Sequence, residues 1–502
     1  MGLHGKVTPL GLSGKACRNR WQVEGPTTLC EPGFRHVLEG QTGTSWRLYV
    51  HHYSPDWASA KPNSIAVSAL GRLGAHLPMV WIHEALDATK KATIRNRRLP
   101  AEYVVQAIIA MGLYRQRSMS EVTESLDLVL PDGTGAFVSK SAITQARQKL
   151  GAAPLELLFR DSSLRWTTES DSEQPWNGLS LWAMDGTSLR TPDSKENRME
   201  FGAQIYPSGK VSSYPQVRIV TLTSIPSRMV VDASFGEYAK NEMRYAEDLI
   251  IKIRDNSLTI FDKGFFSAAL LLGLTNNGHD RHFLIPARKD LRYERISGTK
   301  NDAIVRMSVS KQAQKMHPEL PQQWSMRMIR AKDSQGNVFH LLTSLQDSKK
   351  YSAKELIYLY ATRWEIETSY CELKVTMSQG APKLRSFSPE MIKQEIWATF
   401  IAYNLVRKEM AEVARRVNAS PCVVSFVRSM HLLQDKLLLQ AAKSRDSKPF
   451  DGLMERRQRR IGQLLHKPGK GRKCPRVVKA KPKKYEERWV RASESPPART
   501  SA

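Results

Sequence analysis

The chain has 502 residues, of which 41% are hydrophobic, so it is long enough to bury more than one core and is expected to form two or three domains. Its 76 Lys and Arg outnumber its 49 Asp and Glu, which gives a formal net charge of +27. Such a surplus argues against an ordinary metabolic enzyme and favours a polyanionic partner, with nucleic acid first and an anionic membrane surface second.

Neither the hydropathy nor the cysteines point to export. No window approaches the roughly 18 uninterrupted apolar residues of a membrane span, and the first thirty residues lack the apolar run of a secretory signal. The five cysteines are scattered without a CxxC pair, so neither a zinc site nor a disulfide framework is indicated. We expect a cytoplasmic protein with free thiols and no membrane partner.

The first part of the chain divides into two regions. Residues 1–68 mix Gly, Pro, Ser, His and Trp without a period, which predicts an irregular N-terminal extension. Residues 69–165 have a helical pattern and are interpreted as an α-helical N-terminal DNA-binding domain. In residues 101–116 the apolar positions recur at spacings of three and four, which predicts that one face is buried: Val104, Val105, Ile108, Ile109 and Leu113.

A second helix is predicted from residue 139 or 141, where Ser139 or Ser141 can cap it. Its buried stripe is expected to be Ala142, Ile143, Ala146 and Leu150. The opposite face would carry basic and amide side chains, namely Lys140, Gln145, Arg147, Gln148 and Lys149. Such a face suits a DNA major groove, but an ordinary solvated helix face explains it equally well.

The composition turns polar over residues 163–178, which indicates a linker, and strands then follow in quick succession. They are predicted at residues 179–184, 217–225, 227–235 and 258–261, followed by a helix at 265–278 and a strand at 282–287. This order predicts an α/β fold with a mixed sheet, whose first part spans residues 176–283.

Short alternating runs over residues 284–347 predict a β-strand insertion. The second part of the core, 348–450, holds two long helices, at 354–377 and 389–416. The second helix should pack on the sheet through Ile396, Trp397, Phe400, Ile401 and Leu405. The C-terminal tail, 451–502, is basic: residues 456–484 contain thirteen Lys or Arg and no acid. It is expected to contact phosphate, although a merely solubilising tail is the alternative.

Two aspartates are candidates for chemistry. Asp185 and Asp262 each close an apolar β run, and each is followed by a pair of residues that can turn the chain. Acids at the carboxyl ends of strands in one sheet can converge, and their mutual repulsion then favours a cation between them. Mg²⁺ prefers such oxygen ligands. The alternative is that each Asp only starts a turn.

Three glutamates lie in the stretch YATRWEIETSYCELK, residues 360–374. At about 100° per residue, one helical stripe about 60° wide holds Tyr360, Arg363, Glu367 and Lys374. Glu365 and Glu372 fall on the far side. Glu367 is therefore the candidate third acid, unless the stripe is a solvated face with an Arg363–Glu367 salt bridge. Two strand-end aspartates, one helical glutamate and flanking basic regions together fit metal-assisted phosphodiester chemistry on DNA.

These residues carry a resemblance to a known family. Tyr360, Arg363, Glu367 and Lys374 match the Y-x₂-R-x₃-E-x₆-K signature of bacterial transposases of the insertion sequence 4 family at every spacing. DGTSLRTPDSKENRMEFG around Asp185 and FDKGFF around Asp262 are similar to that family's first and second aspartate blocks. The resemblance covers roughly residues 70–485 and leaves the N-terminal extension without a counterpart.

The resemblance implies a ribonuclease-H-like catalytic core, interrupted by the β-rich insertion and preceded by the helical DNA-binding domain. Asp185, Asp262 and Glu367 would be catalytic residues and ligands of two Mg²⁺ ions, with Mn²⁺ as a substitute. Tyr360, Arg363 and Lys374 would contact the DNA of the transposon end. An aromatic residue of the insertion, Trp324 or Phe339, would hold a flipped base.

The implied activity is cut-and-paste transposition: nicking at terminal inverted repeats, excision through hairpinned ends, and strand transfer into target DNA. A homodimer would assemble two ends and cut in trans, and the cytoplasmic protein would associate with the nucleoid when bound to DNA. A different class of function stays open, because a catalytically inactive, sequence-specific DNA-binding protein derived from a transposase would keep the same acids.

Overall fold

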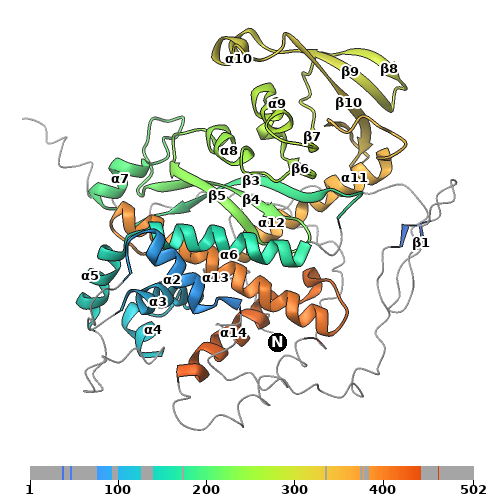
Figure 1. The fold of residues 1–502 in the computed structure, drawn as a ribbon. Helices are drawn as coiled ribbons and strands as arrows, with labels where there is room; N and C mark the ends of the chain where they lie inside the picture. The colour runs from blue at the N-terminus through green and yellow to red at the C-terminus, as the bar shows by residue number, and fades with distance from the viewer. Residues whose placement is uncertain are drawn as a thin grey trace, which may run out of the picture.

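The computed structural model of the protein describes residues 37–38, 46–47, 76–92, 100–125, 139–171, 175–333, 336–373, 377, 384–441 and 462. It is a mixed α/β fold in which one sheet of nine strands has helices on both faces (Figure 1). The N-terminal extension, apart from the short pair β1 (Val37–Leu38) and β2 (Trp46–Arg47), and the C-terminal tail, apart from residue 462, lie outside the described residues.

The order of strands in the sheet is β5-β4-β3-β6-β7-β11-β10-β9-β8. Strand β3 pairs in parallel with β6, and β6 with β7, whereas all other neighbours are antiparallel. The sheet is therefore mixed, as the sequence predicts. The bounds are β3 (Ser180–Arg190), β4 (Gln216–Ser224), β5 (Val230–Glu237), β6 (Ser257–Phe261), β7 (Arg281–Pro286), β8 (Glu294–Gly298), β9 (Asp302–Ser308), β10 (Gln323–Lys332) and β11 (Val338–Thr343).

Strands β8–β11 come from the segment that the sequence interprets as an insertion, and they continue the central sheet at its far edge (Figure 1). The short helix α10 (Lys311–Met316) lies among them. Strand β8 is not predicted by the sequence, because all five of its residues are exposed and no alternation of apolar and polar side chains marks it.

Each face of the sheet has its own helices because alternate residues of a strand point to opposite sides. Trp182 and Met184 of β3 pack under α8 (Glu242–Ile250) and α9 (Ala268–Asn276). Ala183 belongs to the opposite face, where α11 (Ala353–Thr362) covers the middle of the sheet. On that same face α6 (Ala153–Asp171) and α13 (Pro389–Arg416) cover β4 and β5.

The N-terminal helices are α2 (Met79–Ala88), α3 (Ala101–Leu113), α4 (Met119–Ser125), α5 (Lys140–Leu150) and α6. Their apolar faces belong to one hydrophobic cluster, which also includes residues of α13 and Val217 and Ile219 of β4. All five apolar positions predicted for α3 are buried. This helical region therefore shares its core with the sheet.

Part of the predicted linker at residues 163–178 is helical. Helix α6 runs on to Asp171, and Ser163, Trp166 and Thr167 are buried within it. The linker interpretation is wrong for these residues, because their hydroxyl groups are satisfied by the helix backbone and by α13. The Thr167 hydroxyl donates to the Ser163 carbonyl, and the Asn404 side chain donates to the Ser163 hydroxyl.

Helix α5 also differs from its prediction. Ser139 caps it by accepting a hydrogen bond from the Ala142 backbone N–H, and Ile143 and Leu150 are buried as expected, but Ala142 is exposed. Arg147, predicted to lie on the exposed basic face, is 3% exposed. Its guanidinium donates to the Gln394 and Ser386 side chains, so it joins α5 to α13 and is not available to a groove.

Helix α13 begins with Pro389 at its first turn and is buried along most of its length. The five apolar positions predicted to pack are all buried in it. Trp397 lies between Phe235 of β5 and Phe159 of α6, with ring centroids 4.8 and 5.2 Å away. The remaining elements are α7 (Lys195–Phe201), α14 (Phe426–Ala441), and the 3₁₀ turns η3 (Lys263–Phe265) and η5 (Pro421–Val423).

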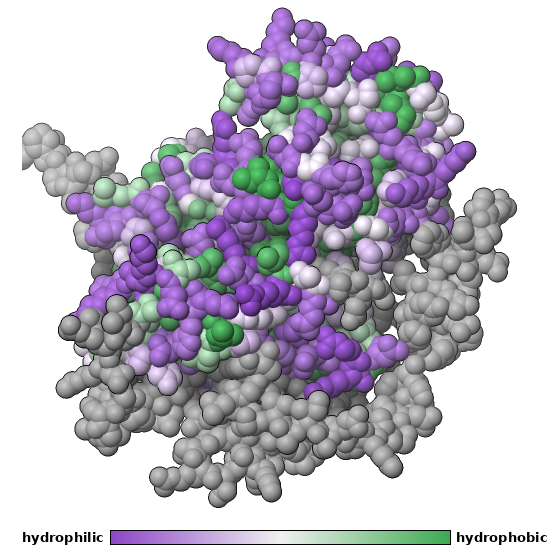
Figure 2. Space-filling view, in the orientation of Figure 1, coloured by the Kyte–Doolittle hydropathy of each residue, from purple (hydrophilic) through white to green (hydrophobic). Residues whose placement is uncertain are grey.

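The surface is mostly polar on the face shown in Figure 2, where hydrophilic residues predominate and hydrophobic ones form separate small groups within the coloured part. Among the described helices, none is long and apolar enough to cross a membrane. Cys371 and Cys422, the two described cysteines, are both free thiols, as expected.

Candidate active site

The two candidate aspartates lie side by side on the central strands. Strands β3 and β6 are parallel, and their last paired residues are Met184 and Phe261. Asp185 follows Met184, and Asp262 follows Phe261. Since neighbouring strands lie about 4.8 Å apart, the two backbones are adjacent where this pairing ends.

Both aspartates are expected on the same side of the sheet. Met184 and Phe261 pack together on the side of α8 and α9. Side chains alternate along a strand, so the residue after each belongs to the opposite side, which α11 and α12 (Trp364–Cys371) cover. Asp262 is extended at φ −77° and ψ 156° and begins the 3₁₀ turn η3.

One detail of the prediction for Asp185 is wrong. Asp185 does not close its strand, because β3 continues to Arg190 in antiparallel pairing with β4. The Asp-Gly pair after the apolar run therefore does not turn the chain. Only the parallel neighbour β6 ends at this level, and that end opens the edge of β3 beside Asp185.

Glu367 lies in α12, but the single helix predicted for residues 354–377 is two helices. Helix α11 ends at Thr362, and α12 begins at Trp364, with Arg363 between them at φ −52° and ψ −28°. A helical wheel drawn from Tyr360 therefore crosses a junction. Within α12 the regular spacing still places Glu367 one turn before Tyr370. The side chains of residues 364–367 and the whole of Lys374 lie outside the described part of the structure.

Tyr370 fixes α12 to the strand that carries Asp185. Its hydroxyl donates a hydrogen bond to the Asp185 backbone carbonyl at 2.6 Å and lies 2.8 Å from the Thr221 hydroxyl of β4. Asp185 and Thr221 are paired residues of β3 and β4. Burial raises the pKa of Tyr370 well above its ordinary value, and the negative charge of Asp185 adds to this, so the hydroxyl keeps its proton.

Glu372 forms ion pairs with two arginines that lie outside α12. Its carboxylate lies 3.7 Å from the Arg228 guanidinium and 3.6 Å from that of Arg407, and it accepts a hydrogen bond from the Tyr403 hydroxyl at 3.1 Å. The Glu372 side chain is 12% exposed, and Arg407 is fully buried. Glu372 therefore holds the end of α12 against α13 and is separate from the aspartates.

The residues predicted to contact DNA differ in exposure. Tyr360 is 3% exposed, and its ring packs on Phe339 with the centroids 6.2 Å apart. The Arg363 guanidinium lies over the same tyrosine ring, 5.9 Å from its centroid. Of the two aromatic residues considered for a flipped base, Trp324 is 8% exposed between Phe266 and Phe283, and Phe339 is half-buried.

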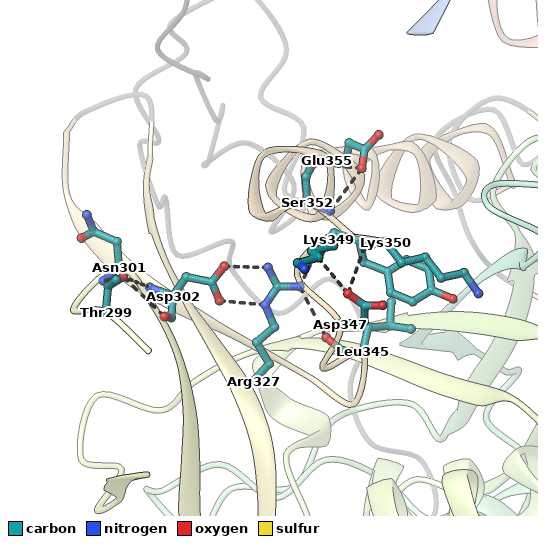
Figure 3. Close-up of polar contacts among 11 residues, drawn as sticks. Thr299, Asn301, Asp302, Arg327, Leu345, Asp347, Lys349, Lys350, Ser352 and Glu355 are labelled. Atoms are coloured by element: carbon teal, nitrogen blue, oxygen red, sulfur yellow. Dashed lines mark hydrogen bonds and ion pairs between the residues drawn. The ribbon is translucent and has the colours of Figure 1, made fainter. Parts of the chain in front are cut away.

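A buried arginine anchors the segment that leads into α11 (Figure 3). Arg327 of β10 is 1% exposed and donates two hydrogen bonds, of 2.7 and 2.6 Å, to the Asp302 carboxylate. It also donates to the Tyr351 and Leu345 carbonyls. Ser352 then caps α11 with Glu355 in a reciprocal capping box. The added strands thereby set where α11 begins.

A fourth acid, Glu242, lies on the opposite face of the sheet from the Asp185 side chain, and no sequence pattern singled it out. Glu242, in the first turn of α8, pairs with Arg218 at 2.9 Å and packs on Gly186, the residue after Asp185. A β-carbon at Gly186 would lie 2.5 Å from the carboxyl carbon of Glu242, so the end of that side chain, which is 38% exposed, would have to move aside. Gly186, a glycine within a β run, is the sequence feature that could have indicated a close neighbour at this point.

The donor set suits a divalent cation. Asp185, Asp262 and Glu367 provide carboxylate oxygens, the ligands that Mg²⁺ and Mn²⁺ prefer. Among the described side chains no group of three potential ligands gathers, and the carboxylate of Glu367 is not among those side chains. The backbone register places Asp185 beside Asp262, and the Tyr370 contact joins α12 to Asp185.

Two family models and a curated relative match most of the chain. Residues 67–160 match the family model described as insertion element 4 transposase N-terminal, and residues 176–405 match the transposase DDE domain. The chain is 36% identical over 419 residues to the transposase InsG for insertion sequence element IS4 of Escherichia coli (strain K12), covering 83% of this chain and 93% of that protein.

Two further matches are more limited. The putative transposase InsZ of the same organism is 36% identical over 222 residues, which are 44% of this chain and 73% of that protein. Among solved structures, the piggyBac transposase synaptic complex with hairpin DNA covers 78% of this chain and 85% of that chain, at 12% identity and a TM-score of 0.39.

The InsG match covers nearly the whole of a transposase at an identity that shows common descent, and the DDE model spans the strands and helices that carry the three acids. The chain therefore belongs to the insertion sequence 4 family of transposases, DNA-cleaving enzymes with a DDE catalytic domain.

Proposed function

We propose that Asp185, Asp262 and Glu367 are the catalytic acids of this transposase and together hold two divalent cations, with Mg²⁺ as the ordinary ion. The observation that carries this proposal is the alignment of Asp185 and Asp262 past the last β3–β6 pair, with α12 bonded to Asp185 through Tyr370. Bound cations would lower the pKa of an attacking hydroxyl and stabilise the leaving oxygen. The three carboxylates would hold the cations where both effects are needed.

The proposed reaction is cut-and-paste transposition. Water attacks the phosphodiester at the end of the terminal repeat, the bond to the 3′ oxygen breaks, and a free 3′-hydroxyl remains on the element. That hydroxyl attacks the phosphodiester of the opposite strand to form a hairpin, and the flanking DNA leaves with its own 3′-hydroxyl. A second water then opens the hairpin. The regenerated 3′-hydroxyl then attacks target DNA, so each step exchanges one phosphodiester bond for another or for water.

Cations of the chain would position the DNA. Arg363 and Lys374 are proposed to contact the phosphates of the transposon end, since their charges neutralise phosphate without carrying sequence information. Tyr360 is almost fully buried beneath Arg363, which favours a role in orienting that guanidinium as well as in contacting DNA. The net charge of +27 fits this use.

The wider architecture supports a ribonuclease-H-like core. The strand order β5-β4-β3-β6-β7 is the one expected for that fold. On one side of β3, strands β4 and β5 pair antiparallel in succession, and on the other side β6 and β7 pair in parallel. Strands β8–β11 are proposed as its insertion. We also propose a homodimer that cuts in trans, and a cytoplasmic protein that joins the nucleoid with its DNA.

The test is nicking of labelled inverted-repeat DNA by purified protein with Mg²⁺. We expect nicks at the repeat ends that disappear in Asp185→Ala, Asp262→Ala and Glu367→Ala. Glu365→Ala should retain activity, since it lies about 160° from Glu367 around the helix axis. If Glu365→Ala lost nicking as severely as Glu367→Ala, the assignment of Glu367 as the third catalytic acid would be wrong. A wild-type protein that binds the repeats but never nicks them would support the inactive DNA-binding alternative.

A further inference from the structure

We propose that Tyr370 is a positioning residue that sets the distance between the helix of Glu367 and the strand of Asp185. The inference rests on the proposed function, because it gives Tyr370 a task only if those two acids share metal ions. Tyr370 stands outside the Y-x₂-R-x₃-E-x₆-K spacing, three residues after Glu367. Its contacts, rather than its place in a motif, indicate the role.

Tyr370 contacts the backbone of a catalytic position. The Tyr370 hydroxyl bonds to the backbone carbonyl of Asp185 itself, at 2.6 Å. Asp185 is the first residue of β3 past its pairing with β6, so this part of β3 has no β6 partner to define its position. A side chain on α12 supplies a fixed contact at the same point.

The hydrogen bonds around Tyr370 run in one direction. A carbonyl oxygen can only accept, so the Tyr370 proton points at Asp185, and the Thr221 hydroxyl must donate to the Tyr370 oxygen. Thr221 also lies 3.4 Å from the Thr223 hydroxyl of the same strand. Two neighbouring strands and one helix are thus joined by a directed chain of hydroxyl groups, in which each bond strengthens the next.

The connection is rigid. Thr221 is fully buried, so water does not compete for the bond. Tyrosine has two rotatable side-chain bonds, and one turn of helix separates Tyr370 from Glu367. Glu372, two residues further on, is held by Arg228 and Arg407. The helix segment after Glu367 is consequently fixed on both sides, against the sheet and against α13.

The chain offers a matched control. Tyr245 of α8 is buried, at 3% exposure, whereas Tyr370 is half-buried, and the Tyr245 hydroxyl likewise donates to a backbone carbonyl, that of Glu237, at 2.9 Å. It lies on the opposite face of the sheet, away from α12. Tyr370→Phe and Tyr245→Phe therefore both remove a hydrogen bond from a tyrosine hydroxyl to a backbone carbonyl, and each should lower Tm by about 1–2 °C.

The experiment compares these variants in two measurements. Titration of Mn²⁺ into the complex of protein with inverted-repeat DNA, followed by calorimetry, reports metal affinity, and single-turnover nicking reports the rate. We expect Tyr370→Phe to bind Mn²⁺ several-fold more weakly and to nick about tenfold to a hundredfold more slowly, since small misplacements of reacting groups have effects of this size. Tyr245→Phe should match the wild type in both.

A second variant tests the same hydrogen bonds without changing the Tyr370 side chain. Thr221→Val keeps the volume of the side chain but removes the donor to Tyr370, and it should reproduce part of the loss. The double variant should be no worse than Tyr370→Phe, because both changes break one chain of bonds. Metal affinity and rate in Tyr370→Phe equal to those of Tyr245→Phe would overturn the positioning role. Undiminished nicking by Asp185→Asn would instead overturn the proposed function itself.

Discussion

Replacing Glu372 by alanine should unfold the protein more easily without removing a catalytic group. Glu372 lies 3.6 and 3.7 Å from two guanidinium groups, and the Arg407 partner is fully buried. Its loss would leave Arg407 and Arg228 as buried charges without this carboxylate. The Tyr403 hydroxyl would also lose one acceptor.

The expected magnitude follows from these distances. At an effective dielectric constant of about 20, each pair attracts by about 4.5 kcal/mol, but burying the charges offsets much of that attraction. Removing one partner of a buried ion pair typically costs about 3–5 kcal/mol. We therefore expect Glu372→Ala to lower the free energy of unfolding by about 3 kcal/mol, and Glu372→Gln, which can still accept from Tyr403, by less.

The assay is urea unfolding followed by tryptophan fluorescence, with nicking measured at a temperature where the variant is folded. Glu372→Ala should shift the midpoint strongly and still nick where it is folded, though more slowly than the wild type, because α12 loses one of its two attachments. Glu367→Gln should unfold like the wild type or later, because it removes one of three mutually repelling acids, and should not nick. A loss of stability below about 1 kcal/mol in Glu372→Ala would refute the reasoning about its ion pairs.

Three further predictions concern how the site is supported, and each is checked by thermal or urea unfolding. Arg327→Met should cost about 3 kcal/mol, because it orphans the Tyr351 carbonyl and the Asp302 carboxylate; an effect no larger than that of Asp302→Asn would contradict this. Gly112→Ala should cost about 1–3 kcal/mol, since its β-carbon would lie 2.9 Å from the Ala402 β-carbon, and Ala402→Gly in the same chain should recover part of the loss. Burial alone would raise the pKa of Glu395, but Arg115 and Arg385 lower it below its ordinary value. The ionised Glu395 therefore contributes to the free energy of unfolding above pH about 4.3, and this contribution is lost as the pH falls through the folded-state pKa. Glu395→Gln should accordingly destabilise the protein at pH 7 and make its stability fall less steeply on acidification.

Local patterns predicted the elements around the site well. The β runs before Asp185 and Asp262 gave β3 and β6, and the apolar spacing of residues 389–416 gave α13. These elements are marked by alternation or by helical periodicity, which depend on near neighbours in sequence. The ion pairs of Glu372 with Arg228 and Arg407 join it to distant segments, and no local pattern predicts them.

Contacts between distant parts of the chain could not be predicted in this way. Arg147 is buried because Gln394 and Ser386, more than 230 residues later, surround it. Tyr370 bonds to a carbonyl 185 positions earlier, and nothing in the local pattern of α12 marks it. Asp185 lies inside its strand because β4 continues beside it, whereas the sequence around it resembles a strand end. Periodicity reports which face is buried but not what lies against it.

The central claim, that three acids hold the metal ions for DNA cleavage, is tested most directly by exchanging each acid for cysteine. A thiolate is a poor ligand for Mg²⁺ and a better one for the softer Mn²⁺. We predict that Asp185→Cys, Asp262→Cys and Glu367→Cys do not nick inverted-repeat DNA with Mg²⁺ and recover with Mn²⁺, whereas Glu365→Cys nicks with both ions. Undiminished nicking with Mg²⁺ in any of the first three variants would contradict the assignment of that residue as a metal ligand.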